Sequence, residues 1–128
     1  MTEAKRTDAD VAATALACLD LTDLSDSCDA ADVETLCARA RTPAGDAAAV
    51  CVWPRFTALA KRQLSATRIR VAVVANFPVG AERVRPVADE IAAAVAEGAD
   101  EIDVVLPYRA FAEGRADAAA TLLDAARR

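Results

Sequence analysis

The sequence has no histidine, and this absence removes several kinds of site at once. Without an imidazole there is no Ser-His or Cys-His nucleophile pair and no histidine ligand for a metal ion. Lysine is also scarce, because Lys5 and Lys61 are the only two in 128 residues. Any catalysis by this stretch of chain must therefore use carboxylate, thiol, hydroxyl or lysine amine groups.

Sequence motifs for metals and nucleotides are missing as well. The four cysteines include no Cys-x-x-Cys pair, so a zinc site has no support. A domain of this size does not need disulfides, and reduced thiols are expected. No Gly-x-Gly-x-x-Gly or phosphate-loop pattern follows a strand. The sequence therefore predicts no metal and no cofactor. The cysteines are Cys18, Cys28, Cys37 and Cys51.

Long apolar runs and basic clusters are also lacking. No uninterrupted apolar run could span a bilayer, and the polar residues 1–8 contain no apolar signal core. The net charge of −5, with scattered basic residues, opposes binding to nucleic acid or acidic membranes. We therefore expect a cytoplasmic protein with neither nucleic acid nor membrane as a partner.

Strand-like and helix-like segments alternate along the chain, whose length suits one domain over residues 1–128. Amphipathic periods predict helices over 8–18, from a cap at Ser27 or Asp29 to about Ala40, and over 55–64, 84–95 and 117–128. Apolar runs predict strands over 19–24, 47–52, 68–75 and 101–106. Pro86 fits the first turn of its helix, and Gly98 suits the position just after the end of that helix.

Nearly all-apolar strands that alternate with amphipathic helices indicate parallel βαβ units in an α/β fold. Two architectures fit: a small open doubly wound sheet, or about half of a (β/α)₈ barrel, which needs roughly 250 residues. Polar side chains gather where strands end, the face on which barrels build active sites. The pattern alone leaves both architectures open. These polar residues are Asp20, Thr22, Arg55, Asn76, Asp103 and Arg109.

Residues 101–109 carry the most informative carboxylate. Asp103 stands among branched apolar residues in what is predicted to be a buried strand, where an unpaired charge is costly. Strand alternation turns Ile102 and Val104 toward the helices, and turns Asp103 toward the opposite, inner face. Asp103 is therefore a candidate functional residue. The alternative is a structural carboxylate that caps a loop or pairs with an arginine.

Five motifs in order resemble those of deoxyribose-phosphate aldolases. They are 19–24 (LDLTDL), 42–45 (TPAG), 49–56 (AVCVWPRF), 74–80 (VANFPVG) and 98–110 (GADEIDVVLPYRA). The resemblance runs from about Leu16 to Arg128. It implies parallel βα units of a (β/α)₈ TIM barrel, here about its first four strands.

The resemblance also implies a lyase that reversibly cleaves 2-deoxy-D-ribose 5-phosphate to acetaldehyde and D-glyceraldehyde 3-phosphate. Such an enzyme uses a lysine Schiff base as electron sink and needs no metal. Asp103 maps to the aspartate of the family's proton relay. Asp20, Thr22 and Cys51 map to residues that line its pocket. We add Asn76 as a candidate substrate contact.

In this family the Schiff-base lysine lies on a later strand, and the phosphate-binding loops come from the later half of the chain. Lys5 is in the polar N-terminus, and Lys61 is predicted on a helix, so neither is at a strand end. The stretch is therefore expected to be inactive alone. Three hypotheses follow: the first part of an aldolase, a half-barrel that closes with a second copy or a complementary C-terminal half, and a non-catalytic remnant that binds a sugar phosphate.

Simpler interpretations of the same residues remain open. Asp20 and Thr22 suit turns, and Cys51 suits a small buried apolar position. Asn76 could use its amide to satisfy loop backbone groups.

Overall fold

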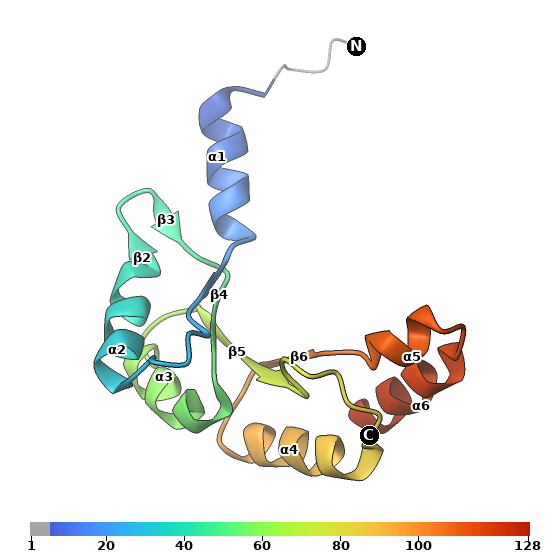
Figure 1. Cartoon of the computed structure of the whole chain (residues 1–128). Coiled ribbons are helices and arrows are strands. Elements are labelled where there is room, and N and C mark those ends of the chain that lie inside the picture. The colour runs from blue at the N-terminus through green and yellow to red at the C-terminus, as the bar shows by residue number, and fades with distance from the viewer. Residues whose placement is uncertain (1–5) are drawn as a thin grey trace.

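The computed structural model describes residues 6–128 and contains a parallel four-stranded sheet (Figure 1). Its strands are β1 (Asp20–Thr22), β4 (Ala49–Val52), β5 (Arg70–Ala75) and β6 (Glu101–Val104), which lie side by side in that order. All three pairings are parallel, as the alternating pattern predicted. Lys5, considered above as a possible nucleophile, lies outside the described residues.

Helices follow or precede each strand. They are α1 (Asp8–Ala17), α2 (Ala30–Arg39), α3 (Thr57–Gln63), α4 (Val84–Ala96), α5 (Tyr108–Ala112) and α6 (Ala116–Ala126), with a 3₁₀ turn η1 (Pro54–Phe56) before α3. The five predicted helices are all present. Helix α5 was not predicted, and neither was a small antiparallel pair of β2 (Arg41–Thr42) with β3 (Gly45–Asp46).

The order of the strands distinguishes the two architectures. A doubly wound sheet reverses its strand order at a switch point and carries helices on both faces. Here the order is sequential, and the helix-side core joins residues of α2 and α3 to the same face of β4 and β5. The opposite face carries a small cluster of buried side chains: Ala49, Cys51, Ala72 and Val74. A sequential sheet with helices on one face is the arrangement of barrel units.

Strand β6 differs from the prediction in length and burial. It ends at Val104 rather than Leu106, and it pairs with β5 alone. Its residues are half-buried, and Asp103 is exposed. The expectation of a buried strand was wrong, because an apolar run cannot distinguish a central strand from an edge strand. The expected alternation is confirmed, since Ile102 packs into the helix-side core.

Local signals in the sequence form as expected. Asp29 caps α2, accepting a hydrogen bond from the Asp32 backbone N–H at 3.0 Å, while Asp32 accepts one in return from the Asp29 N–H. Pro86 is the third residue of α4, within its first turn. Gly98 follows the C-cap Glu97 with φ +100°, a conformation that glycine adopts at little cost.

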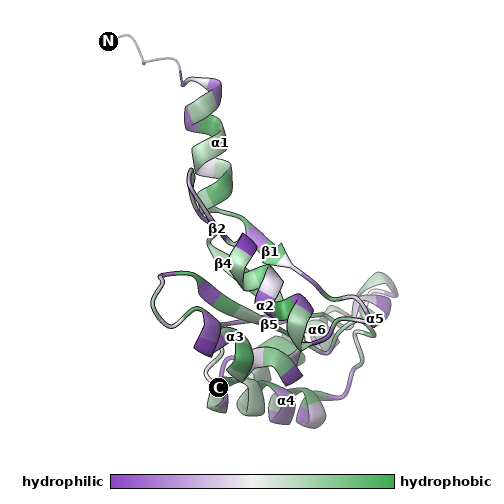
Figure 2. Cartoon of the chain, turned by 90° about the vertical axis from the view of Figure 1, so that its left-hand side faces the viewer, coloured by the Kyte–Doolittle hydropathy of each residue, from purple (hydrophilic) through white to green (hydrophobic). Residues whose placement is uncertain are grey.

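Helix α1 stands apart from the rest of the fold. It projects from the sheet in both views (Figures 1 and 2), and none of its residues is buried. Val11 is 53% exposed, although the apolar period of the helix predicts a face for packing. Among residues 6–128, no helix is long and apolar enough to cross a membrane.

Candidate active site

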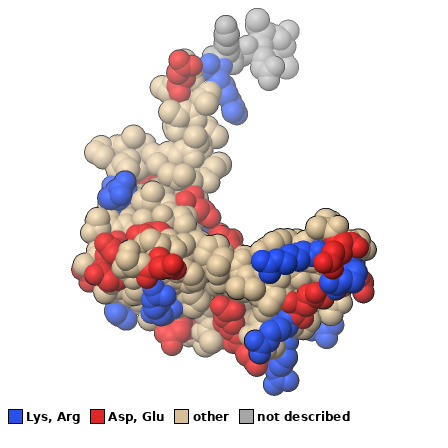
Figure 3. Space-filling view, in the orientation of Figure 1, with Lys and Arg blue, Asp and Glu red and all other residues tan. Residues whose placement is uncertain are grey.

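The candidate site is on the inner, helix-free face of the sheet. Strand register places Thr22 opposite Cys51 and Asp103 opposite Val74, so these side chains share one face. A cavity of about 430 Å³ opens there, and the surface is hollowed between the sheet and the α5–α6 side (Figure 3). Its lining is Thr22, Leu24, Cys51, Val74, Phe77, Ile102, Asp103, Val104 and Val105.

Cys51 and Asp103 contact each other in this cavity. The Cys51 thiol donates a long hydrogen bond to Asp103 Oδ2, with sulfur and oxygen 3.7 Å apart. Burial raises the pKa of Cys51 to about 12, and the charges of Asp103 and Asp20 add to the rise. Cys51 is therefore a neutral thiol at pH 7. It can line a pocket and donate a hydrogen bond, but it is a poor nucleophile.

Asp20 and Thr22 are both exposed on strand β1. Thr22 lines the cavity, and its hydroxyl donates to the Asp20 carbonyl at 3.1 Å. Asp20 is not in the lining, although its charge acts on Cys51. Three of the five predicted site residues, Thr22, Cys51 and Asp103, thus meet in one cavity. Its described lining holds an acidic group and no basic side chain.

Asn76 lies outside this cavity and has a different set of partners. Its side-chain Nδ2 donates to the Ala81 and Val105 carbonyls, each at 2.9 Å. Its Oδ1 accepts from the Ala81 N–H at 3.0 Å. These contacts match the simpler interpretation, in which the amide satisfies loop backbone groups.

The apolar part of the cavity lining was not predicted from the sequence. Leu24, Val74 and Phe77 form walls beside Asp103 and Cys51. Phe77 meets Trp53 edge-on, with ring centroids 5.3 Å apart. A sequence pattern could place Val74 on the inner face by alternation, but the two loop residues come into range only through the tertiary fold.

The arginine and tryptophan at the ends of the strands serve packing. Arg55 lies over the rings of Trp53 and Phe56, at 5.4 and 4.7 Å from their centroids, and donates to the Cys28 carbonyl. Trp53 Nε1 donates to the Ser25 carbonyl at 3.2 Å. Together these contacts tie the loop after β1 to the end of β4. They give Arg55 and Trp53 a structural role.

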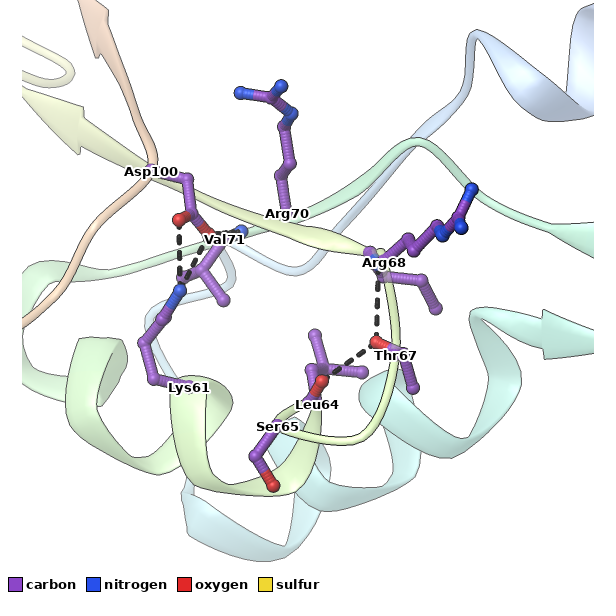
Figure 4. Close-up of a pocket in the computed structure, with 9 residues that line it drawn as sticks. Lys61, Leu64, Ser65, Thr67, Arg68, Arg70, Val71 and Asp100 are labelled. Atoms are coloured by element: carbon purple, nitrogen blue, oxygen red, sulfur yellow. Dashed lines mark hydrogen bonds and ion pairs between the residues drawn. The ribbon is translucent and has the colours of Figure 1, made fainter.

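A second cavity, of about 340 Å³, lies beside Arg70 and Val71 at the opposite end of strand β5 (Figure 4). Lys61 points to Asp100 there and donates to both carboxylate oxygens at 2.9 Å. Asp100 also accepts from the Val71 N–H at 2.8 Å. Lys61 is thus committed to an ion pair at the end of the sheet away from Asp103, as its predicted helical position suggested.

One group of side chains has the composition of a metal site. Ligand atoms of Asp23, Cys28 and Asp32 all lie within 4.8 Å of one another. Asp23 already accepts hydrogen bonds from Ser25, and Asp32 belongs to the capping box of α2. Burial raises the pKa of the Cys28 thiol, with help from the two carboxylates. A protonated thiol is a weak ligand, so local hydrogen bonding accounts for this group.

Charges on the visible face are mixed. Acidic and basic side chains alternate over the surface without a continuous basic area (Figure 3). This distribution, with a net charge of −5, gives no electrostatic support for nucleic-acid binding.

Known proteins resemble both the sequence and the fold. The chain is 45% identical over 120 residues to a deoxyribose-phosphate aldolase from Agrobacterium fabrum, covering 93% of this chain and 46% of that protein. It matches the crystal structure of a candidate deoxyribose-phosphate aldolase from Coccidioides immitis with a TM-score of 0.83 and 29% identity, over 90% of this chain and 45% of the other.

A tetrameric deoxyribose phosphate aldolase from Aeropyrum pernix shares the fold, with a TM-score of 0.67 and 19% identity over 91% of this chain and 61% of that chain. The fold is thus the parallel βα half of a TIM barrel. The chain spans about half the length of the Agrobacterium and Coccidioides proteins it matches. The family profile of the DeoC/LacD family aldolase matches residues 14–127, and the chain belongs to this family.

Proposed function

We propose that this chain supplies the first half of an aldolase site that cleaves 2-deoxy-D-ribose 5-phosphate to acetaldehyde and D-glyceraldehyde 3-phosphate. The observation that carries the proposal is the position of Asp103. It lies on the inner face near the carboxyl end of β6, 3.7 Å from the Cys51 thiol, in a cavity open to solvent. Active sites of parallel barrels form at this end of the strands.

Asp103 is assigned to proton transfer. In the proposed reaction, a lysine amine forms a Schiff base with the substrate carbonyl, and the imine takes up the electron pair of the breaking carbon–carbon bond. A carboxylate beside it accepts and returns protons through bound water. Thr22 and Cys51 are assigned to the pocket, where a neutral thiol and a hydroxyl can contact a polar substrate.

The Schiff-base lysine is assigned to the other half of the barrel. Lys61 is paired with Asp100 at the end of the sheet opposite this cavity, and it is not among the residues that line the cavity. The relatives are about twice as long as this chain, which leaves room for four further βα units. We propose that residues 1–128 form one folding unit that is inactive without that second half.

A reducing compartment fits the thiols. All four cysteines are free, and three of them are buried. Disulfides are rare in the cytoplasm, so we place the protein there.

The test uses a chimera in which residues 1–128 replace the matching part of the Agrobacterium relative. With acetaldehyde and borohydride, intact-mass spectrometry should show a trapped adduct on the chimera and none on the isolated chain. The chimera should cleave the sugar phosphate, and Asp103→Asn should lower kcat by about 10²- to 10⁴-fold. A folded chimera without cleavage contradicts the proposed function, and an adduct at Lys61 contradicts the assignment of the lysine.

A second arrangement is favoured by the open sheet. Strands β1 and β6 each have one neighbour, and unpaired edges readily recruit further strands. We propose that these two edges are closed by a complementary C-terminal half or by a second copy of the chain. The mass of the chain in solution distinguishes the two.

A further inference from the structure

The loop after β5 turns back on itself at Asn76, which has a backbone φ of +58°. Such a conformation is uncommon outside glycine, and asparagine is one of the residues that tolerates it. The turn directs the Asn76 N–H to Glu90 Oε2 on α4, at 3.0 Å, instead of along the sheet. The Asn76 carbonyl accepts from the Gly80 N–H at 2.9 Å, which closes the loop.

This turn interrupts the hydrogen-bond ladder at the end of β6. The Val105 N–H still donates to the Ala75 carbonyl at 3.0 Å, one step past the last strand residue. In a parallel ladder the Val105 carbonyl would next accept from the backbone N–H of Phe77. The Asn76 side chain takes that place, because its Nδ2 donates to the Val105 carbonyl at 2.9 Å. The amide thus acts as a further rung of the ladder.

The neighbouring groups show that this rung is fully built. Both Nδ2 protons are used, one on Val105 and one on Ala81, and Oδ1 accepts from the Ala81 N–H. Gly80, at φ +62°, lies so close that an added Cβ would meet the Leu106 carbonyl and the Tyr108 ring. The loops after β5 and β6 are therefore joined as one unit, two residues beyond Asp103.

We propose that Asn76 is a positioning residue that holds the free edge strand β6 in register, and thereby keeps Asp103 in contact with Cys51. The inference rests on the proposed function for its catalytic meaning, since Asp103 is the proton-transfer group there. Its geometry concerns this chain alone. β6 has a neighbour on one side, so the rung supplied by Asn76 is the last hydrogen bond from β5 and its following loop that holds its carboxyl end.

The test is a double-mutant cycle read at Cys51. Asn76→Gly keeps the turn, because glycine accepts a positive φ, but removes the amide. Alkylation of Cys51 by iodoacetamide at pH 8 is followed by peptide mass spectrometry in the full chain. Losing the nearby Asp103 charge should increase the thiolate fraction, so the glycine variant should react about threefold faster or more, equivalent to about half a pKa unit.

The same substitution is then made in an Asp103→Asn background, where no carboxylate remains to be displaced. We expect Asn76→Gly to have no further effect there. Equal acceleration in both backgrounds would mean general loosening of the fold and would overturn the inference, as would no acceleration in either. Neither reading depends on aldolase activity, so an inactive chimera leaves this result intact.

A second variant guards against misfolding of the glycine chain. Asn76→Asp keeps the size and the tolerance for positive φ, but puts an oxygen against the Ala81 and Val105 carbonyls. Amide hydrogen exchange should become faster at Val105 while Val73, in the middle of β5, stays protected. Unchanged protection at Val105 would contradict the proposed rung.

Discussion

At the residue scale, two carboxylates that are close in the sequence, Asp100 and Asp103, have different partners. Asp103 is exposed on the inner face, where it accepts a hydrogen bond from the Cys51 thiol. Asp100, three residues earlier, is held by Lys61 and by the Val71 N–H. The partners of Asp100 give it a structural role, whereas Asp103 is the residue that we propose for proton transfer.

Asp100→Asn tests the structural role. The ion pair with Lys61 disappears, and we expect a loss of about 1 kcal/mol in the free energy of unfolding, measured by urea denaturation at pH 7. Asp89→Asn is the matched control: its pair with Arg85 on α4 is strongly exposed, so its effect should stay within about 0.5 kcal/mol.

The difference between wild type and Asp100→Asn should also depend on pH. Partial burial acts to raise the pKa of Asp100, but the hydrogen bonds from Val71 and Lys61 outweigh it and hold the pKa below its ordinary value of 3.8. Because the folded-state pKa is depressed, the stabilisation is complete above the unfolded value and is lost as pH falls through the folded one. The stability gap should therefore be constant from pH 5 to 7 and shrink below about pH 4. A gap that widens in acid would contradict this assignment.

At the element scale, two helices with the same cap differ in what they support. Thr7 on α1 and Asp29 on α2 each form a capping box. Helix α2 buries Val33, Leu36 and Cys37, whereas α1 buries nothing. A capping box contributes to the stability of the fold only when its helix is packed against the rest of the protein.

Asp29→Ala should therefore lower the free energy of unfolding by about 1 kcal/mol, measured by chemical denaturation. Thr7→Ala should leave that free energy nearly unchanged and reduce the helical circular dichroism slightly, because α1 can fray without opening the core. Equal losses of stability for the two variants would show that α1 is coupled to the sheet.

Two glycines with positive φ provide a test of the joined loops. A Cβ at Gly80 would overlap the Leu106 carbonyl and lie 2.7 Å from the Tyr108 ring. At Gly114, with φ +86°, nothing lies within 4 Å of the added atom. Gly114→Ala should cost about 1 kcal/mol for backbone strain alone. Gly80→Ala should cost at least about 1 kcal/mol more, seen as a larger drop in urea midpoint, because the steric overlap adds to the same strain.

At the scale of the whole molecule, the sheet is closed on neither side. β1 and β6 each pair with one strand, and the helix-free face exposes polar groups of β1 and β6. The Agrobacterium and Coccidioides relatives are about twice as long as this chain. We therefore expect the open edges of the sheet to be closed, either by association with a second copy of the chain or by a C-terminal half.

Size-exclusion chromatography with light scattering should show a mass above that of the 13.3 kDa chain, rising with concentration. The double substitution Asp20→Lys and Thr22→Lys, at two exposed positions of edge strand β1, should shift the chain to monomer. The control is Asp89→Lys with Ala92→Lys, at two exposed positions of α4, which should leave the mass unchanged. A well-folded monomer at all concentrations would leave a complementary half as the remaining way to close the sheet.

The sequence by itself determined the longer helices, the four strands of the main sheet and the family. Periodicity placed the five predicted helices and the four parallel strands, because burial of apolar side chains repeats with the geometry of each element. The cap of α2 at Asp29 followed from local hydrogen bonding, with the Asp29 side chain accepting from the Asp32 backbone N–H. The ordered motifs carried the resemblance to aldolases.

Only the tertiary structure decided which distant residues are in contact. Whether β6 is central or at an edge depends on which strand lies beside it, so the exposure of Asp103 could not be inferred from its apolar neighbours. The contact between Cys51 and Asp103 spans 52 positions, and the link from Asn76 to Val105 spans 29. Helix α5 was missed because its five residues are too few for a helical period to show. Contacts between residues so far apart in the sequence are set by the register of paired strands, which a local sequence pattern cannot predict.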